Sequence, residues 1–389
     1  MTGGETDGET AGERAGVDAS GARGVQVGDH NVQVSYFATP SPAVADLQAL
    51  HPRTAAKRIL GLPAEDSAAL IAQLTVQHAA DVVEELLLRD EPLTVAVLTS
   101  MHPARAQELT TRLAAVADWL TDLPQAAAAI RKVHDGARAE LGDESGPIVR
   151  AGARPMPAFQ LACARGVVAW RAITGAVAVT GEIAAYHRPK EWGFPISPER
   201  DGVQRFEYAD VHIRRRGMPV PVAGAIRQAW WSSGEALGRA LTYEQAEGPS
   251  PGGWAGSAQD FADPGSFGRA AVYTSSRGGV VALFDPILAL YREHGGPTGW
   301  LGFPVADSAG PGHGDAVQHF EGGVILRRPQ HAALAVPLPI HAAATAARLG
   351  APVGPVQPLG SGDTAQFFEG GLVTLRDGTA EVWLRPPAG

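Results

Sequence analysis

The stretch VQHFEGGVILRR, residues 317–328, recurs in this chain and decides the expected fold of its second half. VQRFEYADVHIRR (203–215) and AQFFEGGLVTLRD (365–377) align with it without gaps, and AQDFADPGSFGRAAVYTS (258–275) aligns with an insertion. Each copy contains Gln, one variable residue and Phe. The shared pairs are Gln204 and Phe206, Gln259 and Phe261, Gln318 and Phe320, and Gln366 and Phe368. Such repetition predicts units that cannot close a core alone and become stable by stacking.

A short amphipathic helix and a Gly-rich corner are expected before each of these segments, which then form β-hairpins. GEIAAYHRPKEWGFP (181–195) matches DPILALYREHGGPTGWLGFP (285–304), so the corner stands as Gly193, Phe194 and Pro195 and as Gly302, Phe303 and Pro304. Gly permits the bend and Pro fixes the exit, and the corner Phe is expected to bury with the Phe after Gln. More degenerate copies lie at 224–240 and 338–360, where the corner is reduced to Leu237-Gly238-Arg239-Ala240 and to Pro358-Leu359-Gly360.

This arrangement resembles the LGFP repeat family over more than half of the chain. The resemblance implies about four helix-plus-hairpin units over residues 155–389. Known members are often exported actinobacterial proteins whose repeats are thought to associate with the cell wall, and some are appended to hydrolases. We expect such an array to bind a glycan, a lipid or a protein, or to act as an effector.

Aromatic residues of the repeats are candidates for lining a ligand groove. The candidates are Trp192, Trp230, Trp231, Trp254, Trp300 and Tyr291. The alternative is that these side chains form the core of the repeats, and the sequence leaves both interpretations open.

Composition limits the classes of function. The 389 residues carry a formal net charge of −9 with no large basic block, which argues against a nucleic-acid partner. The bias of Arg over Lys, with much Ala, Gly and Pro, suggests a GC-rich genome such as that of an actinobacterium. Cys163 is the single cysteine, so no intrachain disulfide can form. The start lacks the pattern of a signal peptide, and Arg165, Arg171 and Glu182 interrupt the most apolar stretch. These features predict a cytoplasmic protein, with the cell envelope as the alternative.

Residues 42–141 are expected to form an all-helical domain, followed by a linker at 142–154. Helices are predicted over 62–74, 75–88, 91–98 and 102–120, and Pro residues at 52, 63, 92 and 103 suit first turns. The Pro-acidic starts followed by Ala/Leu helices resemble the helical repeats of the N domain of MgtE magnesium transporters and of FliG. The resemblance implies a helical-repeat architecture and not magnesium transport, because no membrane domain follows.

Residues 1–41 are expected to be a disordered tail that carries one ordered motif, GVQVGDHNVQVSYF (24–37). Two interpretations compete: a hairpin docked on the folded body, or copies from many chains stacked as a β-arch with valine zippers and amide ladders. The residues of the motif are Val25, Gln26, Val27, Gly28, Asp29, His30, Asn31, Val32, Gln33 and Val34.

The motif resembles the RIP homotypic interaction motif, whose core is Val/Ile-Gln-Val/Ile-Gly, and the related amyloid-signalling motifs, matched here by Gly24, Gln26, Gly28 and Asn31. The resemblance implies self-assembly through residues 24–37, seeded by a nucleotide-binding receptor with a matching motif.

No catalytic constellation, metal site or cofactor motif emerges, so we expect no cofactor and no catalytic residues. The predicted fold is multidomain, α plus α+β. The first functional hypothesis is a cytoplasmic adaptor or effector of bacterial immunity or programmed cell death, assembled by the N-terminal motif. The alternative is an LGFP-type cell-envelope binding protein, and a third is a hydrolase with a degenerate site.

Overall fold

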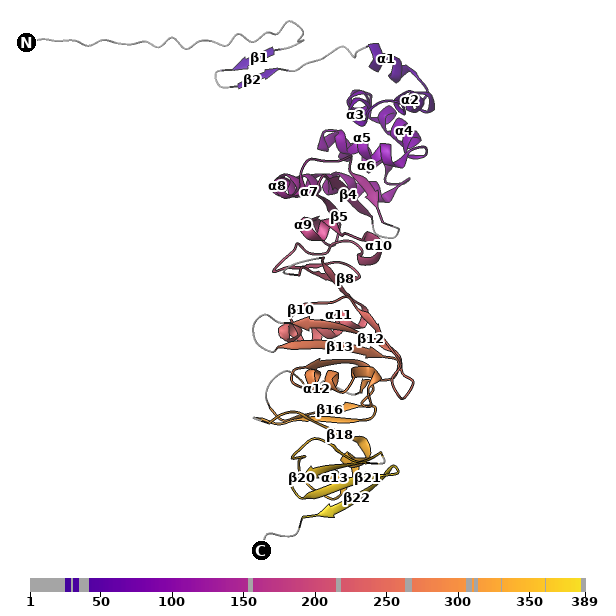
Figure 1. Ribbon diagram of the computed structural model, residues 1–389. Coiled ribbons are helices and arrows are strands. Elements are labelled where there is room, and N and C mark those ends of the chain that lie inside the picture. Colours follow the sequence, from indigo (N-terminus) through magenta and orange to yellow (C-terminus); the bar gives the residue numbers. More distant parts are fainter. Residues whose placement is uncertain are drawn as a thin grey trace, which may run out of the picture. The chain divides into compact units, whose positions relative to one another are not determined.

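The computed structural model describes most of the chain (Figure 1). The described residues are 25–28, 31–34, 42–152, 157–214, 218–262, 268–305, 310, 314–329, 331–360 and 362–385. Contacts divide the chain into two units, Met1–Pro124 and Gln125–Gly389. This boundary lies before the predicted limit of the helical domain at residue 141, because most of helix α7 (Leu123–Gly136) belongs to the second unit.

The N-terminal motif contains two paired strands, β1 (Val25–Gly28) and β2 (Asn31–Val34). They are antiparallel, with Val25 opposite Val34 and Gln26 opposite Gln33. This is a hairpin, as in the first of the two interpretations, because the two arms pair with each other through backbone hydrogen bonds. The side chains of both strands, together with Asp29 and His30, lie outside the described residues, as do residues 1–24, for which disorder was predicted.

The rest of the first unit is helical, as predicted. Its helices are α1 (Pro42–Ala49), α2 (Pro52–Ile59), α3 (Ala64–Ala72), α4 (Val76–Leu87), α5 (Glu91–Ser100), α6 (Pro103–Leu113) and the 3-10 turn η1 (Asp118–Asp122). Pro52 and Pro103 each open a helix, where a missing N–H costs nothing. The helix predicted over 102–120 ends at Leu113, because Ala117 has extended backbone angles before η1.

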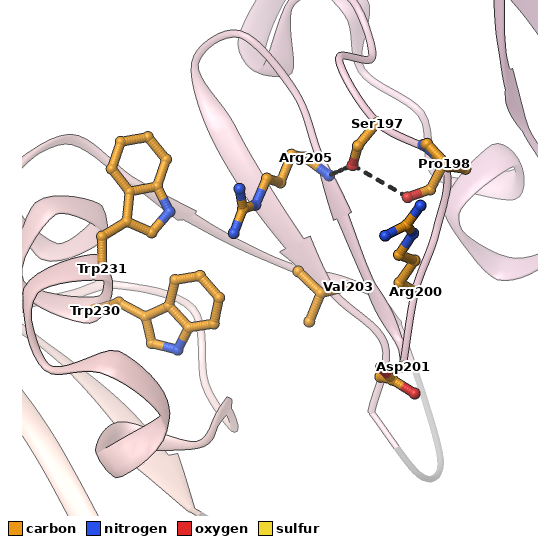
Figure 2. A pocket seen from close by; sticks show the side chains of 8 residues that line it. All are labelled: Ser197, Pro198, Arg200, Asp201, Val203, Arg205, Trp230 and Trp231. Atoms are coloured by element: carbon orange, nitrogen blue, oxygen red, sulfur yellow. Dashed lines mark hydrogen bonds between the residues drawn. The ribbon is translucent and has the colours of Figure 1, made fainter.

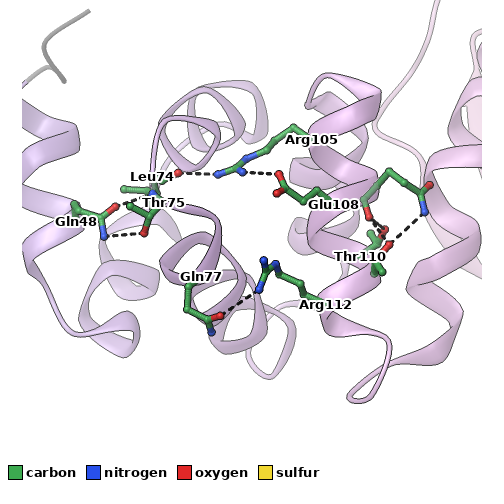
Figure 3. Close-up of polar contacts among 10 residues, drawn as sticks. Gln48, Leu74, Thr75, Gln77, Arg105, Glu108, Thr110 and Arg112 are labelled. Atoms are coloured by element: carbon green, nitrogen blue, oxygen red, sulfur yellow. Dashed lines mark hydrogen bonds and ion pairs between the residues drawn. The ribbon is translucent and has the colours of Figure 1, made fainter. Parts of the chain in front are cut away.

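Polar side chains satisfy helix ends in this unit (Figure 3). The amide of Gln48 accepts from the Thr75 N–H (2.8 Å) and donates to its hydroxyl (3.2 Å), just before α4. Arg105 of α6 donates to the Leu74 carbonyl (2.7 Å), beyond the end of α3, and pairs with Glu108 (2.8 Å). Terminal N–H and C=O groups that lack intrahelical partners are thereby hydrogen-bonded.

The described strands of the second unit form five antiparallel sheets. The first contains β3 (Val149–Ala151), β4 (Ala158–Cys163), β5 (Gly166–Arg171) and β6 (Gly175–Val179). The second contains β7 (Val203–Arg205), β8 (Ala209–His212) and β9 (Val220–Ala223). The third contains β10 (Arg239–Ala240), β11 (Gln245–Glu247), β12 (Gly256–Ala262), β13 (Arg269–Ser275) and β14 (Gly279–Phe284). The fourth contains β15 (Pro304–Val305), β16 (Ala316–Phe320), β17 (Gly323–Arg327) and β18 (Leu334–Pro337). The fifth contains β19 (Gln357–Gly360), β20 (Asp363–Phe368), β21 (Gly371–Arg376) and β22 (Thr379–Leu384).

Short helices precede each sheet. They are α7 with α8 (Arg138–Leu141), α9 (Gly181–Ala185) with α10 (Pro189–Trp192), α11 (Gly224–Ser232) with η2 (Gly234–Leu237), α12 (Ile287–Glu293) with η3 (Gly296–Thr298), and α13 (Leu338–Ala346). The sequence predicted about four units from residue 155, whereas the first sheet adds one more, and β3 lies in the predicted linker at 142–154.

Helices α12 and α13 each pack between two sheets, which explains why no unit closes a core alone. On α12, Ile287, Leu288 and Tyr291 pack in one buried cluster with Leu283 of the third sheet and Ile325 of the fourth. On α13, Ile340 is buried with Val324 and Val336 of the fourth sheet and with Phe368 and Val373 of the fifth. We call the face of a sheet toward its own helix the inward face and the opposite face the outward face; in the third and fourth sheets the outward face packs against the next helix.

Candidate binding site

Every unit turns into its sheet through the same four-residue corner. The second residue is Gly with φ between 67 and 77° in all five, a left-handed conformation that favours Gly. The first residue is buried, and the fourth pairs with a residue at the end of the following long strand. The corners are Leu141–Glu144, Trp192–Pro195, Leu237–Ala240, Leu301–Pro304 and Leu349–Pro352, and they pair with Cys163, Phe206, Phe261, Phe320 and Phe368.

The fifth corner lies ten residues before its predicted place, because Leu349-Gly350 and not Leu359-Gly360 forms it. Leu349 is 2 % exposed, Gly350 has φ 75°, and Pro352 pairs with Phe368. The predicted corner, Pro358 to Gly360, instead forms the exposed strand β19.

A glutamate that the prediction did not single out explains why the corner needs Gly. Glu321 accepts from the Phe303 N–H (2.7 Å), and a Cβ at Gly302 would lie 2.8 Å from its carboxyl carbon. Glu207 and Glu369 take the same place over Gly193 and Gly350. The sequence contained a signal for this glutamate, because Glu directly follows the shared Phe in three of the four aligned segments.

The shared glutamines are buried, and three of them tie neighbouring units together. Gln204 donates to the Ala178 carbonyl of the first sheet (2.8 Å) and to Ser197 beyond its own corner (3.1 Å). Gln259 bonds in the same way to Pro221 and Thr242, and Gln366 to Ala335 and Gly354. Gln318 is also fully buried. Gln204, Gln259 and Gln366 therefore hold neighbouring repeats together, and their burial keeps all four glutamines from a ligand.

One pocket combines aromatic and cationic side chains (Figure 2). It has a volume of about 780 Å³ and lies between the loop before β7, β7 itself and helix α11. Its lining residues are Ser197, Pro198, Arg200, Asp201, Val203, Arg205, Trp230 and Trp231. Pockets that bury small ligands commonly measure about 300–1,000 Å³. This pocket is the candidate binding site.

Trp231 is exposed and held by a buried ion pair. Asp210 is fully buried and accepts from the Trp231 indole N–H (2.6 Å) and from Arg227 (2.8 Å). The Arg227 guanidinium lies 4.4 Å from the centroid of the Trp231 ring, a cation–π contact. Trp231 as a whole is still 47 % exposed. Trp231 is thus a fixed apolar platform on the pocket wall.

Trp230 is fixed by two other contacts. Its indole N–H donates to the Gly238 carbonyl (2.7 Å), and its ring meets the edge of His212 at 4.8 Å between centroids. His212 is fully buried, and its Nδ1 accepts from the Ala240 N–H (3.1 Å). Burial lowers the pKa of His212 to about 4, with the charge of Arg239 as a smaller cause. His212 is therefore neutral near pH 7 and supports Trp230 as an uncharged ring.

The six predicted groove aromatics do not share one groove. Trp230 and Trp231 line the pocket, but Trp192 (3 % exposed) and Tyr291 (0 %) belong to the core. Trp254 packs against the core of α12, and Trp300 is an exposed ring whose N–H reaches His294 at 3.4 Å. Helical spacing could not separate these roles, because an aromatic residue at the end of a short helix can face either the core or the solvent.

Two further findings concern the described residues only. They contain no helix long and apolar enough to span a bilayer, and no cluster of three or more His, Cys, Asp or Glu side chains arranged to hold a metal ion.

Comparison with known proteins gives one family match. The model of the LGFP repeat matches residues 301–343, which span the fourth corner, the fourth sheet and the start of α13. No curated protein matches the chain. The match does not extend to residues 24–37 or 42–141, so it lends no support to the resemblances to the RIP homotypic interaction motif or to MgtE and FliG.

Proposed function

We propose that residues 125–389 form an array of five LGFP-type repeats and that the protein is a binding protein of the cell envelope. The matched segment supplies one corner, one sheet and the start of one helix. Four further corners share its left-handed Gly and its strand pairing, and three of these four carry the buried glutamine that bridges to the preceding sheet.

The observation that carries this proposal is the pocket beside Trp230 and Trp231. Its polar groups suit recognition better than catalysis. The Ser197 hydroxyl donates to the Pro198 carbonyl (3.1 Å) and accepts from the Arg205 N–H (3.4 Å), so it is engaged within its own loop. The lining residues include no histidine to act as its base. Fixed indole rings beside exposed cationic side chains form a binding surface.

Sedimentation of the full chain with washed bacterial cell envelopes tests the proposal. We expect Trp231→Ala to weaken binding by at least about tenfold, or 1.4 kcal/mol. Trp300→Ala is the matched control, because Trp300 is an exposed indole (38 %) outside the pocket, and it should change binding by less than about twofold. Failure of the wild-type chain to sediment would reject envelope binding, and equal binding by both variants would reject this pocket.

Self-assembly through residues 24–37 is a second candidate function. The observation that favours it is the register of β1 and β2, which places Val opposite Val and Gln opposite Gln. Like residues paired in this way suit stacking on a second copy and on a receptor with a matching motif. Replacing Gln26 and Gly28 should abolish thioflavin-positive fibres of the full chain and leave its circular dichroism unchanged. Fibres that form equally fast in the double variant would reject this candidate.

A further inference from the structure

The pocket exists because one inter-repeat contact differs between units. The residue between the shared Gln and Phe lies on the outward face of its sheet, toward the next helix. In the third sheet this residue is Asp260, and it forms an ion pair with Arg292 of α12. In the fourth sheet it is His319, whose ring lies 6.4 Å from that of His341 on α13. In these two sheets the position contacts the following helix.

In the second sheet the same position is Arg205, and the contact is missing. Helices α11 and α12 each have a buried isoleucine near their start, Ile226 and Ile287. Trp231 and Arg292 each lie five residues after that isoleucine, so Trp231 takes the position of Arg292. An indole cannot form an ion pair with a guanidinium, so Arg205 and Trp231 both remain exposed and line the pocket. Within the described part of the chain, Arg205 has no hydrogen bond or ion pair through its guanidinium.

A second guanidinium lines the same pocket. Arg200 is exposed, and it too lacks a side-chain partner among the residues that the structure describes. Figure 2 shows Arg205 between the two indoles and the loop that carries Arg200. Asp201 is the one carboxylate among the lining residues, so the two guanidiniums are only partly neutralised. The pocket therefore favours an anion.

We infer that this pocket binds a saccharide that carries an anionic group, which deepens the proposed function and rests on it. The apolar faces of Trp231 and Trp230 suit the C–H face of a sugar ring, because an indole offers a large rigid apolar surface. The planar guanidiniums of Arg200 and Arg205 suit a carboxylate or a phosphate, which each can bind through two parallel hydrogen bonds. Because Asp210 and Arg227 already hold Trp231, little ordering is needed on binding.

Calorimetric titration of the full chain tests this inference with matched probes. The probes are a trimer of galacturonic acid, galactose 6-phosphate, a neutral galactose trimer and inorganic phosphate. We expect the wild-type chain to bind at least one charged sugar at least tenfold more tightly than the neutral trimer and inorganic phosphate. Whichever charged sugar binds more tightly identifies a carboxylate or a phosphate as the group recognised. Affinity should fall as salt is added, because both guanidiniums are exposed.

Paired variants separate the two parts of the pocket. Arg200→Gln with Arg205→Gln should weaken charged-sugar binding at least tenfold and leave neutral-sugar binding unchanged. Arg58→Gln with Arg214→Gln is the control, since both residues are exposed and neither lines the pocket. Trp231→Ala should weaken both kinds of sugar.

Three outcomes would overturn the inference. They are equal affinity for charged and neutral trimers, inorganic phosphate binding as tightly as the charged sugars, and unchanged binding in the double arginine variant. Retained sedimentation with envelopes in any of these cases would leave the proposed function standing, whereas loss of sedimentation by the wild-type chain would reject both.

Discussion

At the scale of single residues, His212 links the pocket to pH. Its folded pKa of about 4 lies below its ordinary value of 6.5, so protonation favours the unfolded chain. The contribution of His212 to stability should be constant above about pH 6.5 and should fall as the pH drops toward 4, by roughly 3 kcal/mol at about 1.4 kcal/mol per pKa unit. Urea unfolding across this range, followed by tryptophan fluorescence, measures the effect.

His212→Gln should flatten that pH dependence, whereas His331→Gln, at an exposed position, should leave it unchanged. Identical pH profiles for all three proteins would show that His212 does not titrate as its burial predicts.

The sequence indicated which residue types form the corner, but it did not reveal every contact that requires them. Gly302, with φ 67°, lies in the bend, and Pro304 begins the strand that follows it. The constraint on Gly302 also comes from Glu321, which occupies the space of a Cβ. This contact joins positions separated along the chain, and spacing alone does not reveal that the two side chains meet.

At the scale of elements, the shared glutamine joins one repeat to the previous one. Gln366 of β20 donates to the carbonyls of Ala335 and Gly354, each at 3.1 Å. Gln366→Met keeps the approximate size of the side chain but removes both donors. We expect it to lower the free energy of unfolding by about 1–3 kcal/mol, because one buried and one partly buried carbonyl lose a hydrogen-bond donor.

Gln357→Met on the exposed strand β19 is the matched control, and it should change stability by less than about 0.5 kcal/mol. Chemical denaturation compares the two variants. Equal stabilities would mean that the glutamine does not hold the sheets together.

Two elements show where the sequence pattern failed. The fifth corner was misplaced because Leu359-Gly360 repeats two letters of the motif, while the true corner, Leu349 to Pro352, has Ala in place of Phe. The first unit was missed because Leu161 and Cys163 replace the shared Gln and Phe. Leu161 pairs with Val168 in the first sheet, and Gln366 pairs with Val373 at the equivalent place in the fifth. The backbone register is therefore the same although the residue types differ.

At the scale of the whole repeat array, each sheet but the fifth has a described helix following it. Val324 and Val336 lie opposite each other on the fourth sheet and are fully buried against α13. The equivalent pair on the fifth sheet is Leu372 and Trp383, and Trp383 is 56 % exposed. No described helix covers this outward face, on which Phe367 is also exposed (47 %). A repeat whose outer face meets water generally presents polar residues there, so this apolar face is unusual.

This difference in burial predicts that replacing apolar residues by serine has a small effect on stability in the fifth sheet and a large effect in the fourth. Trp383→Ser with Phe367→Ser should reduce the binding of a hydrophobic dye and change the free energy of unfolding by less than about 1 kcal/mol, because both side chains already contact water. Val336→Ser should cost about 3 kcal/mol or more, because it leaves a cavity and a buried hydroxyl under α13. Dye fluorescence and urea unfolding of the full-length variants measure both effects. If the Trp383 and Phe367 double variant loses as much stability as Val336→Ser, then the fifth sheet is covered in solution, and its exposed indole marks a contact with another element or another copy of the chain.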